Sequence, residues 1–109
     1  MEAFMKLPNG SFVQLREDRI ESMKSSIRYN PFRWKNGVVG FYMKGDRIVP
    51  VVDLNEKLET EGGTKRVFVI MKSVVFSIGY SSLKLEKPSG EEIDLEAMSR
   101  EVLEDLGVI

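Results

Sequence analysis

Three pairs of short β-prone runs, each joined by a turn sequence, most constrain what this chain can fold into. The first pair flanks Pro8-Asn9-Gly10, where Asn-Gly tolerates the positive φ angles of a tight hairpin turn. The second pair flanks Lys44-Gly45-Asp46, and the third flanks Lys72-Ser73. The pattern predicts three antiparallel hairpins in series, made by residues 2–7 with 11–16, 38–43 with 47–54, and 66–71 with 74–79.

The segments around these hairpins carry weaker signals. Ile20 and Met23 lie three residues apart within residues 17–24, which predicts a short helix there. Residues 25–36 contain proline and end in Asn-Gly, so we predict a connecting loop.

Two aromatic residues and one proline allow more specific predictions. Phe32 and Trp34 are expected to anchor the connecting loop in the core. Pro50 cannot donate a hydrogen bond to a neighbouring strand, so its strand is expected at a sheet edge.

The last part of the chain predicts an amphipathic helix over about residues 91–106. Asp94 can cap its start, and Gly107 can end it. Apolar residues recur at helical spacing, and acidic residues alternate with them, which is typical of a solvated helix face rather than of a metal site. The whole chain, residues 1–109, is therefore expected to form one mainly β domain, a small antiparallel β-barrel of the SH3- or OB-like kind with a C-terminal helix.

The chain contains neither cysteine nor histidine. This excludes disulfides, Cys/His zinc sites, thiolate nucleophiles and imidazole acid-base catalysis. We predict a protein that is not an enzyme and holds no cofactor or metal. The start of the chain lacks the pattern of a signal peptide, and no apolar run is long enough to span a bilayer, so we expect a cytoplasmic protein.

Residues 24–47 combine six basic residues with a single acidic one, although the net charge of the whole chain is −1. Aromatic residues are interleaved with the basic ones, a combination that suits single-stranded nucleic acid. In that alternative the binding residues are Arg28, Arg33, Trp34, Lys35 and Tyr42. In the competing interpretation the aromatic side chains fill the core and the basic groups form a solvated rim, which could equally bind a protein.

A family resemblance adds a specific hypothesis. The segment that runs from Gly37-Val38-Val39 to Ile48-Val49-Pro50-Val51-Val52-Asp53-Leu54 resembles the centre of CheW-like domains, and the overall order of elements is similar over about residues 1–80. Lys44 stands where the family usually has Arg, and the chain ends after one helix where a full CheW-like domain would add further strands. The resemblance implies a signalling adaptor without cofactors that couples chemoreceptors to a CheA-type histidine kinase.

The candidate protein-binding residues are those of the motif hairpin: Lys44, Gly45, Val49, Val51 and Asp53. Simpler roles compete at each position, since valines in strands are usually core, glycine suits a tight turn, and aspartate can cap a helix. A third hypothesis is an oligomerising structural protein whose tail helix packs on another copy of the chain.

Overall fold

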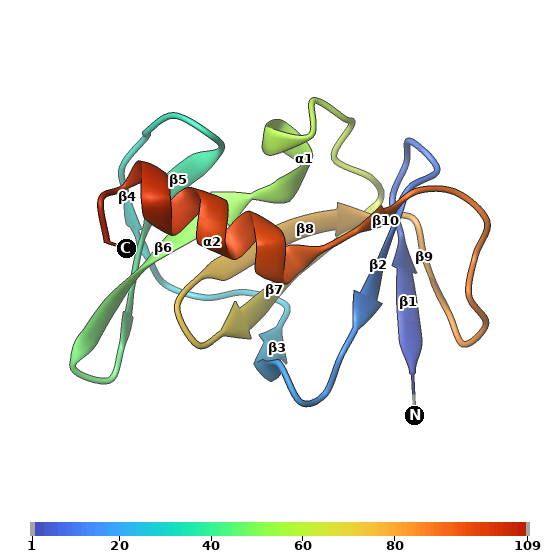
Figure 1. Ribbon diagram of the computed structural model, residues 1–109, viewed down its shortest axis with the longest axis horizontal. Coiled ribbons are helices and arrows are strands. Elements are labelled where there is room, and N and C mark those ends of the chain that lie inside the picture. Colours follow the sequence, from blue (N-terminus) through green and yellow to red (C-terminus); the bar gives the residue numbers. More distant parts are fainter. Residues whose placement is uncertain (1, 109) are drawn as a thin grey trace.

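The computed structural model describes residues 2–108, which form a mainly β structure with a longer helix near the end (Figure 1). The strands are β1 (Ala3–Lys6), β2 (Phe12–Leu15), β3 (Ile20–Lys24), β4 (Asn30–Pro31), β5 (Val38–Lys44), β6 (Arg47–Asp53), β7 (Lys65–Met71), β8 (Val75–Tyr80), β9 (Ser82–Lys84) and β10 (Glu92–Ile93). The helices are the single turn α1 (Leu54–Lys57) and the amphipathic α2 (Leu95–Asp105).

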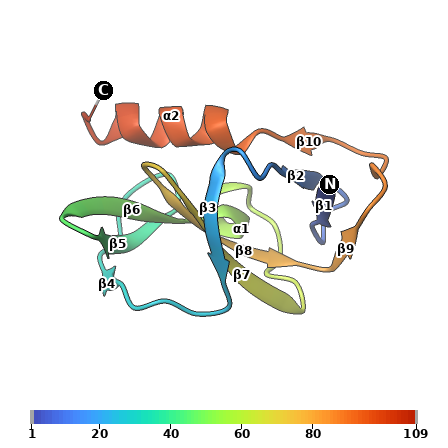
Figure 2. The same ribbon diagram turned by 90° about the horizontal axis from the view of Figure 1, so that it is seen from below.

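The strands form two sheets rather than a closed barrel. One sheet has the order β10-β2-β1-β9, and the other has the order β3-β7-β8-β6-β5-β4. Both sheets are mixed, because β10 pairs with β2 and β6 pairs with β8 in parallel. The prediction of a small antiparallel barrel is therefore wrong on two points. The sheets do not close into a barrel, and two of the strand pairs are parallel. Strands β3 and β4 form the two edges of the larger sheet, and the chain that joins them runs along one face of it (Figure 2).

All three predicted hairpins are confirmed. Strand β1 pairs antiparallel with β2, β5 with β6, and β7 with β8. In the second hairpin Lys44 faces Arg47, so Gly45 and Asp46 form a two-residue turn, and Gly45 has a φ angle of 63°.

Two local predictions are wrong. Residues 20–24 form the edge strand β3 instead of a helix, because they pair with β7 after a turn in which Arg19 and Ile20 donate backbone hydrogen bonds to Arg16. Pro50 lies in β6 between β5 and β8, not at a sheet edge. The ladder to β8 begins only at Val51, so the missing N–H of Pro50 costs no strand hydrogen bond.

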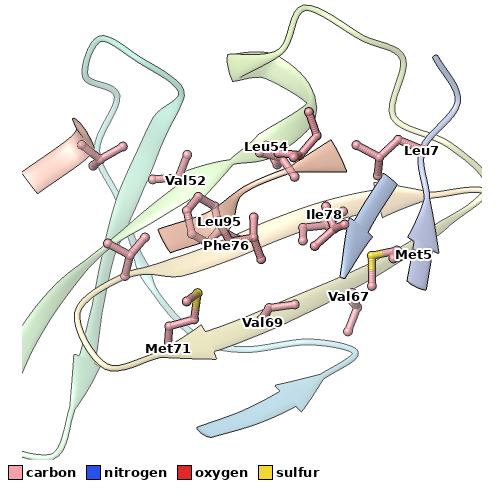
Figure 3. Close-up of a cluster of buried hydrophobic side chains, with 14 of the residues drawn as sticks. Met5, Leu7, Val52, Leu54, Val67, Val69, Met71, Phe76, Ile78 and Leu95 are labelled. Carbon is pink, nitrogen blue, oxygen red and sulfur yellow. The ribbon is translucent and has the colours of Figure 1, made fainter. Parts of the chain in front are cut away.

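The main core lies between one face of the six-stranded sheet, the β1–β2 hairpin and α2. Phe76 and Ile78 of β8 and Met5 of β1 are fully buried there, and Leu95 of α2 is buried in the same cluster (Figure 3). A second, smaller cluster lies on the opposite face of the same sheet. It contains the buried residues Val49, Val51, Ile70 and Val75, covered in part by Ile27 and Tyr29 of the connection from β3 to β4.

Helix α2 confirms the prediction of a C-terminal amphipathic helix, with a later start. Asp94 caps it by accepting hydrogen bonds from the backbone N–H groups of Glu96 and Ala97, at 3.0 and 3.2 Å. Residues 92–93, which were expected to be helical, instead form β10 beside β2. Among the described residues, no helix has the length and apolar character needed to cross a membrane.

We expect Phe76→Ala to lower the free energy of unfolding by about 3 to 5 kcal/mol, because it leaves a cavity where α2 meets the sheet. Urea denaturation followed by circular dichroism measures this change. Ile48→Ala is the control, and its change should stay within about 0.5 kcal/mol since Ile48 is exposed. Similar losses in both variants would contradict the core described above.

Candidate functional site

Large apolar side chains gather on the surface at the end of the sheet formed by β4, β5 and β6. Phe32, Trp34, Met43 and Ile48 are 50%, 48%, 54% and 65% exposed. The ring of Phe32 stacks on Trp34, with centroids 5.9 Å apart and an interplanar angle of 21°, and lies 5.7 Å from the ring of Phe41. We call Phe32, Trp34, Phe41, Met43 and Ile48 together the apolar surface.

Strand geometry places these side chains together. Phe41 and Met43 alternate along β5 and therefore project from the same face, and Ile48 of β6 is the cross-strand partner of Met43. The N–H groups of Phe32 and Trp34 donate to the carbonyls of Val39 and Val38, at 2.9 and 3.0 Å. These bonds hold the two aromatic residues along the outer edge of β5.

This placement corrects the expectation that Phe32 and Trp34 anchor the connecting loop in the core. Both side chains remain about half exposed, because the pairing with β5 places them at the sheet edge. Ile27 and Tyr29 contact the second core cluster instead and anchor the connection.

Lys44, the predicted partner contact in the turn, is tied to the protein itself. Its Nζ lies 2.7 Å from Oε1 of Glu21 and donates to the backbone carbonyls of Lys72, at 2.9 Å, and Met71, at 3.4 Å. Its side chain is only 22% exposed. Lys44 therefore fastens the tip of the β5–β6 hairpin to β3 and to the β7–β8 turn.

The other four motif residues do not form a shared surface. Gly45 is exposed at the turn, and an added Cβ there would meet no atom within 4 Å. Val49 and Val51 are 2% and 0% exposed and belong to the second core cluster. Asp53 caps α1, with its Oδ1 accepting from the N–H of Glu56 at 3.2 Å.

The residues of the nucleic-acid hypothesis do not share one surface either. Tyr42 alternates with Phe41 along β5 and packs against the second core cluster, so it faces away from the apolar surface. Arg33 is bound to Glu56, with 2.6 Å between Nη1 and Oε1. Arg28, Trp34 and Lys35 remain exposed.

Sequence reasoning missed Met43 and Ile48 as surface residues. A signal was present, because Phe41 and Met43 share one strand face and the two-residue turn sets Ile48 opposite Met43. The strand pattern does not say which face of the hairpin stays exposed, because that depends on which distant elements cover the sheet.

The described residues offer no group of three or more acidic side chains placed to hold a metal ion. Every buried side-chain nitrogen and oxygen among them has a hydrogen-bond partner. Exposed apolar side chains are thus the candidate binding feature, and four of the eight large ones among the described residues belong to the apolar surface. Comparison with known protein families finds no model that matches this chain, and comparison with curated proteins likewise finds no match.

We expect Lys44→Met to loosen the hairpin tip, because it removes the charged donor to Glu21 and the two carbonyls. The free energy of unfolding should fall by about 1 kcal/mol. Amide hydrogen exchange at Gly45 to Arg47 should become faster. Lys35→Met, which removes an exposed lysine, is the matched control and should change neither quantity. Unchanged exchange at the tip in Lys44→Met would show that Lys44 does not fasten the hairpin.

Proposed function

We propose that this protein is a non-catalytic adaptor that binds other proteins through the apolar surface. The observation that carries this proposal is the exposure of Phe32, Trp34, Met43 and Ile48 along one edge of the sheet, with Phe41 between the two pairs. Exposed apolar side chains that touch one another mark interaction sites more often than scattered ones do. Trp and Met are also residue types that interfaces favour.

The resemblance to CheW-like domains supports the signalling form of this role. The similar segment forms the β5–β6 hairpin, which carries Met43 and Ile48 of the apolar surface. On this proposal the chain acts in the cytoplasm as one domain, and its partner is a CheA-type histidine kinase or a chemoreceptor.

The apolar surface favours protein over nucleic acid. Met43 and Ile48 make up one part of it, and neither offers a ring on which a base could stack. Arg33 and Lys44, two of the basic groups nearest to it in sequence, already pair with carboxylates of this chain. The half-exposed Trp34 beside Lys35 is the observation that keeps nucleic acid as a second candidate.

The third hypothesis, assembly through the tail helix, has less support. The apolar residues of α2 are used within the chain, where Leu95 and Val102 are buried and Met98, Leu103 and Leu106 pack against the main core. Ion pairs of Glu96 with Arg19 and of Glu101 with Lys57 further hold the helix in place.

We expect Ile48→Lys to abolish capture of the partner from native cell extract, because it places a charge within the apolar contact. Mass spectrometry of proteins retained on the immobilised wild-type chain and on the variant measures this. Leu85→Lys is the matched control, since Leu85 is also exposed but follows β9 in the other sheet, and it should retain the partner. A kinase or receptor retained equally by both variants would contradict binding through the apolar surface.

A titration with fluorescently labelled single-stranded DNA at low and at physiological salt tests the second candidate. We expect no saturable binding at either salt concentration. Tight binding that weakens steeply as salt rises, and that Trp34→Ala reduces, would instead identify a nucleic-acid-binding protein.

A further inference from the structure

Strand β5 is longer than the strand beside it. β5 extends to Lys44, whereas its pairing with β4 joins only Phe41 to Asn30 and Gly40 to Pro31. Within the part of the chain that the structure describes, no strand pairs with the outer edge of β5 beyond Phe41.

The register between β4 and β5 shows which backbone groups of β5 have no partner. The carbonyl of Val39 accepts from the N–H of Phe32, so it points to the outer edge of β5. Backbone groups of alternate residues in a strand point to the same side, which directs those of Phe41 and Met43 outward as well. Phe41 is covered by β4, but the N–H and C=O of Met43 have no strand partner among residues 2–108.

A groove opens at this edge. It is lined by Ile27, Arg28, Tyr29, Asn30, Phe41 and Met43. Its strand side thus carries two members of the apolar surface. Arg28 on the opposite side is exposed, and no carboxylate within the described residues forms an ion pair with it. The groove therefore offers a free backbone donor and acceptor, apolar contacts and one available positive charge.

We infer that this groove receives an extended, acidic segment of the partner protein, which adds as a strand to the free edge of β5. The backbone of Met43 supplies main-chain hydrogen bonds, Phe41 and Met43 contact alternate apolar side chains of the segment, and Arg28 pairs with one of its carboxylates. This inference rests on the proposed function and specifies the partner of the same surface. The outer edge of β4 is a poorer template, because Pro31 has no N–H to donate.

A capped synthetic hexapeptide of alternating valine and glutamate tests the inference by NMR titration of the labelled full chain. We expect amide shifts and slower hydrogen exchange at Met43. The same peptide with lysine in place of glutamate should bind more weakly, and Arg28→Glu should reverse that preference. Met43→Pro removes the N–H while keeping a small apolar side chain, so it should bind about fivefold more weakly than Met43→Ala.

The outcomes separate this inference from the proposed function. Equal binding of the acidic and basic peptides would overturn the acidic character of the segment and the role of Arg28. Equal affinities of the two Met43 variants, or no response at Met43, would overturn strand addition. If Met43→Pro does not fold, hydrogen exchange of the Met43 amide in the wild-type chain replaces this comparison. Slower exchange when the peptide binds supports strand addition, and unchanged exchange overturns it. Capture of the natural partner that is lost in Ile48→Lys would leave the adaptor role intact in any of these cases.

Discussion

The rest of the structure depends on the need to cover the six-stranded sheet on both faces. In β8, one of its two central strands, Phe76 and Ile78 are buried against one face while Val75 is buried against the other. Such a strand is stable only if apolar groups lie on both sides of it. The β1–β2 hairpin and α2 cover one side, and the connection from β3 to β4 covers the other (Figure 2).

Part of the apolar surface lies beyond the covers of the sheet. Met43 and Ile48 project from the face opposite Tyr42, which is the face that α2 and the β1–β2 hairpin cover, but neither residue belongs to the main core there. The tip of the β5–β6 hairpin extends past β4 (Figure 1), and Lys44 fastens this tip to Glu21 of β3 and to the carbonyl of Lys72. Met43 and Ile48 are consequently held in a fixed position but remain uncovered. A rigid, exposed apolar patch is suited to recognition because little conformational entropy is lost on binding.

Local signals in the sequence were enough to predict the hairpins and the tail helix. Asn9-Gly10 and Gly45-Asp46 impose tight turns, and the cap at Asp94 fixes the helix start within a few residues. These features depend on neighbours in the chain, so they can be recognised without knowing the fold.

Features that depend on distant pairing could not be predicted in this way. Ile20 and Met23 have helical spacing, yet pairing with β7 makes their segment a strand. Pro50 indicated an edge strand, but it is tolerated inside the sheet because β8 joins one residue later. The exposure of Phe32 and Trp34 likewise depends on β4 joining β5, which no local pattern specifies.

Hydroxyl-radical footprinting of the protein in native cell extract tests most directly whether the apolar surface is the binding face. Trp34 and Met43 lie on that surface, whereas Met23, 40% exposed on the opposite edge strand β3, provides an internal control. We predict that oxidation of Trp34 and Met43 slows in the extract relative to the isolated protein, while that of Met23 does not. Protection of Met23 with no change at Trp34 and Met43 would place the partner on another surface and contradict this account.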